Sequence, residues 1–512
     1  MQSIFDSAPP PPCPEPFNMA AHVLAHADAL HDKVALAVVS ARGQDRMTYA
    51  ALKRAVLGTG AGFLKAGCVP GDLVLMRLGN TVDFPIAYLG ALAVGLVPIP
   101  TSAALTAVEV SQIMAELQPR VILRDPSVTC VPGAPEIGVA TLRAMRAFDP
   151  AHWHMGDPER LGYIVYTSGT SGTPRAVAHA HRAIWARQMM HAGWYGLTQS
   201  DVVMHAGAFN WTYTMGTGLM DPWSVGATAL IPEPGTSPAD LGGLMADSAA
   251  TIFAASPGVY RQMLTRSVLP RLPHLRHGLS AGEKLPPALH ARWGDATGTP
   301  LYEAYGLSEC STFISASPAR PTSPDTLGYP QPGRRVSIRD QDGGAVARGA
   351  PGVIAVHRSD PGLMQGYLNQ PDETASRFQG DWFMTGDVGC MAADGAITYL
   401  GRNDDMMNAG GYRVSPLEVE AALSCAPGIT AVGATQIEVK PGTFIIAAFY
   451  TGPHPLDEDA LHAYVGTRLA RYKQPRAYVH VPELPSGANG KLQRRRLHLF
   501  WPNSAAPNTK AP

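Results

Sequence analysis

The chain has 512 residues, of which 46% are hydrophobic, and a formal net charge of −1 at pH 7. A chain of this length exceeds what one compact core supports, so we expect a large domain and at least one smaller domain. The charge balance excludes a protein that binds nucleic acid through a basic surface, because binding to phosphate backbones depends on an excess of Lys and Arg. The expected ligands are therefore small molecules.

The cysteines and the N-terminus indicate the compartment. Six cysteines are scattered along the chain without a CxxC pair, so neither a disulfide framework nor a zinc site is expected. The first residues lack the basic and apolar segments of a signal peptide, and no apolar run reaches membrane-spanning length. We therefore expect a cytoplasmic protein that does not interact with a membrane.

The first elements in the chain predict an α/β domain. Proline-rich residues 7–16 indicate an extended leader, which we place over residues 1–16. Apolar runs then alternate with helical patterns: a strand is expected at 73–76, a helix at 85–93 and a strand at 97–100. This order predicts a large N-terminal domain, residues 17–402, with largely parallel β-sheets covered by helices.

Later segments change in character. Short strands are expected at 353–356, 382–384 and 396–400. Beyond Arg402, a helix at 416–423 and strands at 445–450 and 478–481 predict a small mobile α+β domain, residues 403–503, followed by a frayed tail at 504–512.

A loop rich in glycine and hydroxyl groups follows the apolar strand expected at 161–165. Its residues are Thr167, Ser168, Gly169, Thr170, Ser171 and Gly172. Small residues let backbone N–H groups approach an anion closely, the hydroxyls add donors, and Arg175 adds a permanent charge suited to phosphate. The pattern differs from the GxxxxGK[ST] loop of P-loop NTPases. Taken alone, the segment could equally be a flexible surface loop.

The loop resembles the phosphate-binding signature of the adenylate-forming superfamily, which contains acyl- and aryl-CoA ligases, adenylation domains of peptide synthetases, and luciferases. A lysine and a glycine usually stand where this chain has Arg175 and Ala176; arginine keeps the charge. The segment from Tyr305 to Glu309 resembles the YGxTE element of the same family. The resemblance implies that Tyr305 stacks on adenine, that the Ser308 hydroxyl contacts the α-phosphate and that Glu309 helps to hold Mg²⁺.

Three further elements follow in the family's order. Thr385-Gly386-Asp387 resembles the ribose-binding TGD, in which Asp387 accepts hydrogen bonds from the ribose hydroxyls. By the same resemblance Arg402 contacts ribose or phosphate, and Asp404 is the hinge between the domains. Lys491, on a glycine-flanked turn, corresponds to the catalytic lysine; a mobile ammonium offsets the repulsion between the carboxylate and the α-phosphate. The alternative for Lys491 is an ordinary solvated side chain.

The acyl pocket and the thiol site are also inferred from the resemblance, which is greatest to the benzoate–CoA ligase branch. The expected pocket residues are Asn210, Trp211, Tyr213, Ser280, Ala281, Gly282, Ala304 and Thr312. Trp211 and Tyr213 offer flat apolar contact to an aromatic ring, although either could be core packing, and a medium-chain acid stays open. The expected coenzyme A contacts are Gly410, Gly411, Arg471 and Lys473.

These elements together imply an AMP-forming acid–thiol ligase. It uses ATP and Mg²⁺ to make an acyl-adenylate and passes the acyl group to coenzyme A. One alternative is a stand-alone enzyme that loads an aryl acid onto a carrier protein, and another is a non-catalytic ATP-binding regulatory protein. A homodimer is expected only from the family.

Overall fold

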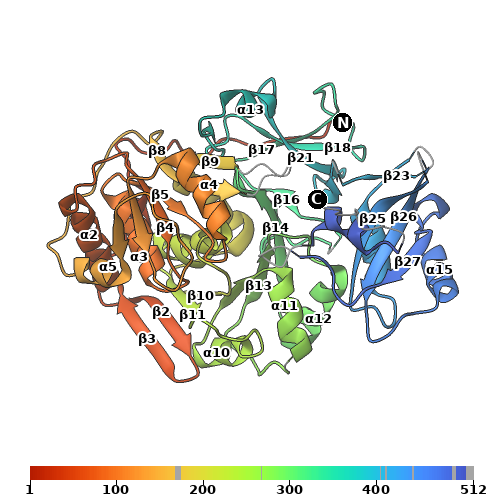
Figure 1. Cartoon of the computed structure of the whole chain (residues 1–512), viewed down its shortest axis with the longest axis horizontal. Coiled ribbons are helices and arrows are strands. Elements are labelled where there is room, and N and C mark those ends of the chain that lie inside the picture. The colour runs from red at the N-terminus through yellow and green to blue at the C-terminus, as the bar shows by residue number, and fades with distance from the viewer. Residues whose placement is uncertain are drawn as a thin grey trace, which may run out of the picture.

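The computed structural model describes residues 1–167, 175–266, 268–323, 325–403, 405–409, 412–440, 443–486 and 492–502. Its largest sheet has nine strands in the order β16-β15-β14-β13-β12-β10-β11-β2-β3 (Figure 1). The bounds are β2 (Val34–Ser40), β3 (Gly43–Thr48), β10 (Val202–His205), β11 (Thr228–Pro232), β12 (Ile252–Ala255), β13 (His277–Ala281), β14 (Leu301–Leu307), β15 (Ser311–Ser315) and β16 (Tyr329–Pro330). The run from β14 to β2 is parallel.

Helices cover this sheet on both faces. Helices α10 (Leu241–Asp247), α11 (Pro257–Arg266) and α12 (Pro287–Thr297) contribute to one core, with Phe253 of β12 and Trp293 of α12 fully buried in it. The opposite side carries α1 (Met19–Val23), α6 (Ala183–Ala186), α7 (Gln188–Met190), η1 (His191–Tyr195), α8 (Thr212–Met215), η2 (Gly216–Met220) and α9 (Asp221–Ser224). Strand β12 is buried along its whole length, as expected of a parallel strand covered on both faces.

A second, four-stranded parallel sheet contains the first predicted elements. It has the order β5-β4-β6-β7, with bounds β4 (Leu73–Arg77), β5 (Val97–Pro100), β6 (Val121–Arg124) and β7 (Glu136–Gly138). Its helices are α2 (Tyr49–Lys65), α3 (Asp83–Ala93), α4 (Ala107–Leu117) and α5 (Val139–Met145). Every residue of α3 is buried, which its nearly continuous apolar sequence permits. The predicted strands and helix in residues 73–100 are confirmed.

A hairpin carries the predicted phosphate loop. Strands β8 (Leu161–Thr167) and β9 (Arg175–Ala180) pair antiparallel, with Thr167 opposite Arg175. The short strand β19 (Gly366–Tyr367) pairs with β9 on its other side. The loop residues Ser168, Gly169, Thr170, Ser171 and Gly172 lie outside the described residues.

The next sheet is antiparallel and six-stranded. Its strands are β1 (Ile4–Asp6), β17 (Arg335–Arg339), β18 (Pro351–His357), β20 (Phe378–Gln379), β21 (Trp382–Met391) and β22 (Ile397–Arg402), with α13 (Pro371–Ser376) beside it. Strand β1 corrects the expectation of a leader over residues 1–16. Ile4 pairs with Ser337 of β17, and the Ser3 hydroxyl donates to the Ala347 carbonyl. Residues 4–6 therefore belong to this sheet, and the proline-rich stretch follows them.

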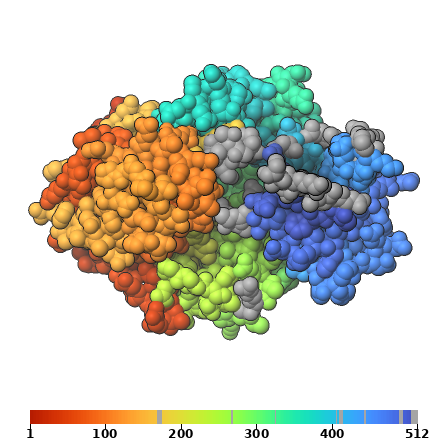
Figure 2. All heavy atoms as spheres, in the orientation of Figure 1, coloured from red at the N-terminus to blue at the C-terminus, as the bar shows by residue number. Residues whose placement is uncertain are grey.

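Residues beyond Arg402 build a separate core. Strands β25 (Ala431–Lys440), β26 (Thr443–Thr451) and β27 (Ala477–His480) form one sheet, and β23 (Met407–Ala409) pairs with β24 (Tyr412–Val414). The helices are α14 (Pro416–Ser424), α15 (Glu458–Gly466), η3 (Arg471–Lys473) and η4 (Arg494–Phe500). Their buried side chains come from residues 407–497, and the unit sits at one end of the molecule, blue in Figures 1 and 2. The α/β fold with a small C-terminal α+β unit is confirmed.

Candidate active site

The candidate site lies at the carboxyl ends of the parallel strands of the nine-stranded sheet, where open α/β sheets bind ligands. A cleft of about 1680 Å³ opens there. The segments that follow β13 and β14 supply Gly282 and Ser308 to its wall, and β21 and β22 supply Asp387 and Arg402. Its far wall comes from the C-terminal unit, including Arg494. The topology thus explains why motifs far apart in sequence share one cleft.

Tyr305, Asp387 and Arg402 form one connected group. The Tyr305 hydroxyl donates to Asp387 Oδ2 at 2.6 Å, and Arg402 Nε lies 3.3 Å from Asp387 Oδ1. Asp387 and Arg402 are direct partners across β21 and β22, which places the two motifs side by side. Burial raises the pKa of Tyr305 well above its ordinary value, so this hydroxyl stays protonated and acts as a donor. The three residues predicted to hold the nucleoside are together.

On the phosphate side, Arg175 is already engaged. Arg175 Nη2 lies 2.6 Å from Glu373 Oε1, and the guanidinium sits 5.1 Å from the centroid of the Tyr367 ring. Thr167, opposite Arg175 in the hairpin, also lines the cleft. A triphosphate bound here would compete with Glu373 for Arg175.

Glu309 has a hydroxyl partner and faces the cleft. The Tyr367 hydroxyl donates to Glu309 Oε1 at 2.7 Å. The Ser308 carbonyl lies 2.7 Å from His179 Nε2; burial lowers the pKa of His179 to about 4, so the ring is neutral and Nε2 is the donor. No cluster of three metal-binding side chains occurs among the described residues. A single carboxylate still suits Mg²⁺, which keeps several waters and takes phosphate oxygens as ligands.

Most predicted acyl-pocket residues line the cleft: Trp211, Tyr213, Ala281, Gly282, Ala304 and Thr312. The Tyr213 ring stands edge-on to Trp211, with centroids 5.2 Å apart, while its hydroxyl donates to the Leu279 carbonyl at 3.0 Å. The Trp211 ring lies over Gly282, where a Cβ would come within 2.5 Å of it. Tyr213 is therefore both core and pocket wall.

Two residues predicted for the acyl pocket, Asn210 and Ser280, do not line the main cleft. Asn210 lines a small adjoining cavity of about 20 Å³ rather than the main cleft. Ser280 is completely buried and does not line the cleft; its neighbour Ala281 does, because successive side chains of β13 point to opposite faces.

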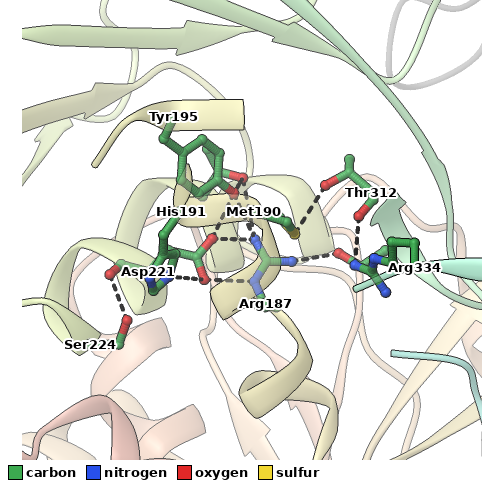
Figure 3. A network of polar contacts seen from close by, with 10 residues as sticks. Arg187, Met190, His191, Tyr195, Asp221, Ser224, Thr312 and Arg334 are labelled. Carbon is green, nitrogen blue, oxygen red and sulfur yellow. Dashed lines mark hydrogen bonds and ion pairs between the residues drawn. The ribbon is translucent and has the colours of Figure 1, made fainter. Parts of the chain in front are cut away.

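Sequence reasoning missed a buried ionic group beside the pocket (Figure 3). Arg187 Nε donates to Asp221 Oδ1 at 2.7 Å, and the Tyr195 hydroxyl donates to Asp221 Oδ2 at 2.7 Å. Arg187 and Thr217 line the cleft. The available signal was Asp221, a single charge within the otherwise apolar run 218–223, since buried charges are paired.

The C-terminal turn begins and ends at the cleft. Ser486 and Leu492 form an antiparallel bridge, and Gln493 N–H donates to the Pro485 carbonyl at 2.8 Å. Ser486 and Leu492 both line the cleft. Lys491 itself lies outside the described residues.

The predicted hinge and coenzyme A positions give a mixed result. Asp404, Gly410 and Gly411 lie outside the described residues. Lys473 lines the cleft and is paired with Glu418 Oε1, whereas Arg471 is exposed and does not line it.

No helix among the described residues has both the length and the apolarity needed to span a bilayer. A family model described as "AMP-binding enzyme" matches residues 24–368. The 3-hydroxybenzoate–CoA ligase of Aromatoleum sp. (strain CIB) is 30% identical over 492 residues, which cover 89% of this chain and 92% of that protein. The benzoate–CoA ligase of Thauera aromatica is 31% identical over 467 residues, covering 84% and 86%.

The fold gives the same result. The crystal structure of a benzoate–CoA ligase from Burkholderia xenovorans LB400 superposes with a TM-score of 0.81 at 27% identity, covering 94% of this chain and all of that one. The relatives are CoA ligases, rather than the carrier-loading or non-catalytic proteins considered as alternatives. The chain therefore belongs to the family of AMP-binding enzymes, in the benzoate–CoA ligase branch of the adenylate-forming superfamily, and is an AMP-forming acyl- or aryl-CoA ligase.

Proposed function

We propose that the chain converts an aromatic carboxylic acid, ATP and coenzyme A into the aryl-CoA thioester, AMP and pyrophosphate, with Mg²⁺. The observation that carries this proposal is the single cleft of about 1680 Å³, which is lined by Arg175, Glu309, Asp387 and Arg402 as well as by the expected acyl pocket. Relatives named for benzoate and 3-hydroxybenzoate support the aromatic class.

The pocket shape favours a flat acid over a flexible chain. Ala281, Gly282, Ala304 and Gly306 offer little side-chain volume, and Trp211 closes over Gly282. Small residues leave room for a flat ring in this part of the cleft wall, and the neighbouring indole offers it an apolar face. The aromatic reading of Trp211 thus has a geometric basis.

Each ATP group has a proposed partner. Tyr305 and Asp387 hold the adenosine, Arg402 contacts the ribose or a phosphate, and Thr167 with Arg175 holds the phosphates beside the loop of Ser168, Gly169, Thr170, Ser171 and Gly172. Glu309 holds Mg²⁺, which supplies charge neutralisation to the phosphates. The Ser308 hydroxyl contacts the α-phosphate.

Attack of the carboxylate on the α-phosphorus brings two anions together. Lys491 offsets their repulsion by touching both, and its turn is anchored on the cleft wall by the pairing of Ser486 with Leu492. The carboxylate forms the new O–P bond as pyrophosphate leaves.

The second step requires the C-terminal unit to move. We propose that residues 403–503 rotate about Asp404, withdraw Lys491 and bring Gly410 and Gly411 to the cleft, a hinge motion of a known kind. The thiol of coenzyme A then attacks the acyl carbon and AMP leaves. Lys473 and Arg471 are the proposed phosphate contacts for coenzyme A, and Lys473 has to exchange Glu418 for that contact.

A panel of carboxylic acids tests the proposal. We expect AMP formation that requires ATP, Mg²⁺ and coenzyme A, with aromatic acids giving the highest kcat/KM and C6–C8 aliphatic acids at least tenfold lower. Higher kcat/KM for the aliphatic acids would overturn the aromatic assignment. AMP formation that does not depend on coenzyme A would overturn the assignment of coenzyme A as the acyl acceptor.

A further inference from the structure

The acyl pocket has a polar end that the proposed substrate class does not explain. Arg187 is 6% exposed and Asp221 is completely buried, yet Arg187 lines the same cleft as Trp211 and Tyr213. A buried ion pair of this kind is no more stabilising than apolar packing of the same volume. Its position on the wall of the cleft therefore points to a role in substrate recognition.

The pair leaves one edge of the guanidinium facing outward. Nε and Nη2 of Arg187 are held by the two oxygens of Asp221, and Nη2 is also within 3.3 Å of the Tyr195 and Thr217 hydroxyls. Figure 3 shows one edge of the Arg187 guanidinium facing the two oxygens of the Asp221 carboxylate, with Tyr195 nearby. Because these contacts fix the plane of the guanidinium, Nη1 has one orientation.

Nη1 is paired with a serine of unusual backbone conformation. It donates one hydrogen to Ser311 Oγ at 2.5 Å. Ser311 has a φ of +60°, a region that costs a non-glycine residue energy and that often marks functional sites. Gly306 permits this conformation, since a Cβ there would lie 2.0 Å from the Ser311 carbonyl oxygen.

Two donors remain at this edge. A guanidinium carries five N–H groups, and the second hydrogen of Nη1 has no acceptor among the described residues. The Ser311 hydroxyl accepts from Arg187 and likewise has no acceptor of its own there. Leaving such donors buried without a partner is unfavourable. In the open cleft water satisfies them, but a bound ring displaces that water.

We propose that Arg187 and Ser311 form a polar end of the acyl pocket that binds a neutral hydrogen-bond acceptor on the aromatic ring, so that the preferred substrates are hydroxylated aromatic acids. This inference rests on the proposed aromatic specificity and narrows it. A ring hydroxyl accepts hydrogen bonds in place of the displaced water, whereas a methyl group or an unsubstituted ring edge leaves the Arg187 and Ser311 donors without an acceptor. Asp221 neutralises Arg187, so a second carboxylate on the ring would be buried without a counter-charge and is rejected.

The test compares substituents of equal size. For the wild type we expect kcat/KM for 3- or 4-hydroxybenzoate to exceed that for the matching methylbenzoate by about 10- to 100-fold, the range for a hydrogen bond to a charged group. The Arg187→Met/Asp221→Leu double variant removes both charges together, and Tyr195 and Thr217 keep their mutual hydrogen bond of 2.9 Å. Because Ser311 keeps its hydroxyl, this variant should lower the ratio at least about threefold without abolishing it, while the methylbenzoates stay substrates.

A matched serine pair gives a second readout. Ser311→Ala should lower the hydroxyl-to-methyl ratio about threefold to tenfold. Ser315→Ala, in the same strand but bonded to the Gly193 carbonyl and absent from the cleft wall, should leave it unchanged. If the double variant does not fold, the comparison of Ser311→Ala with Ser315→Ala tests the polar end of the pocket on its own.

The charge balance gives a third readout. Asp221→Asn leaves Arg187 unneutralised. The ratio of kcat/KM for isophthalate to kcat/KM for 3-nitrobenzoate, whose nitro substituent is isosteric with carboxylate but neutral, should therefore rise at least about tenfold. Equal wild-type ratios for hydroxyl and methyl, or ratios unmoved by Ser311→Ala and by the double variant, would overturn the polar end of the pocket and leave the aromatic ligase intact. Failure of the wild type to activate any benzoate would instead refute the aromatic assignment.

Discussion

Arg494→Met should loosen the C-terminal unit in a way that depends on pH. Arg494 lies three residues beyond Lys491 in the sequence. Its Nε donates to Glu420 Oε1 at 2.9 Å and its Nη2 donates to Glu420 Oε2 at 2.6 Å. The Ala434 N–H donates to the same Glu420 Oε1 at 2.9 Å. The pair therefore joins the catalytic turn to α14 and β25. Removing the arginine leaves the buried Glu420 carboxylate without its counter-charge.

The destabilisation has an upper bound set by protonation of Glu420. Burial already raises the pKa of Glu420, although Arg494 opposes the rise, so losing Arg494 raises this pKa further. The pKa of a glutamate in the unfolded chain is about 4.3. Keeping the Glu420 carboxyl protonated in the folded state therefore costs about 1.4 kcal/mol for each pH unit above this value, or about 2 kcal/mol at pH 6 and about 5 kcal/mol at pH 8. The folded state binds the extra proton, so stability is lost as pH rises.

Hydrogen exchange measures this directly. In peptides covering α14 and β25, corrected for intrinsic exchange, the opening free energy of Arg494→Met should fall from pH 6 to pH 8 with a slope approaching about 1.4 kcal/mol per unit. Arg494→Met/Glu420→Gln should show no such slope. Destabilisation that is independent of pH, or stability that rises with pH, would refute the reasoning.

Three other changes follow from the contacts. Glu373→Gln removes the partly exposed ion pair that holds Arg175, which is worth about 1 kcal/mol. The KM for ATP in pyrophosphate exchange should therefore fall about fivefold. An unchanged KM would contradict competition between Glu373 and the triphosphate for Arg175. Tyr367→Phe removes the hydroxyl that orients Glu309, so the Mg²⁺ concentration for half-maximal activity should rise about threefold to tenfold, and an unmoved titration would disprove that role. His205 is buried with a pKa lowered to about 3, so the unfolded state binds more protons below pH 6.5 and stability is lost as pH falls, by about 2 kcal/mol at pH 5. The melting temperature of His205→Phe relative to that of the wild type should therefore rise as the pH falls from 8 to 5. Parallel plots of melting temperature against pH for the two proteins would exclude this role of His205.

The motifs were predictable because each carries its chemistry in a few adjacent residues. Tyr305, Asp387 and Arg402 could be named from sequence, and their meeting follows from β21 pairing with β22. Helix α3 and its flanking strands were predictable for a similar reason, since continuous apolar runs bounded by turns indicate buried elements.

Features that depend on distant pairing were not predictable. Arg187 and Asp221 are 34 residues apart, and no local pattern joins them. Strand β1 forms only because β17 offers an edge more than 300 residues later in the chain, as the pairing of Ile4 with Ser337 records. Ser280 and Ala281 could not be told apart without knowing which face of β13 meets the cleft.

Separate measurement of the two half-reactions of Lys491→Ala tests the central claim most directly. The account predicts that pyrophosphate exchange falls by two orders of magnitude or more, roughly the loss seen when a group that stabilises developing charge is removed. Thioester formation from a supplied aryl-adenylate and coenzyme A should stay within about fivefold of wild type, because Lys491 is withdrawn in that step. Equal loss of both half-reactions would contradict the proposed role of this lysine and the domain rotation together.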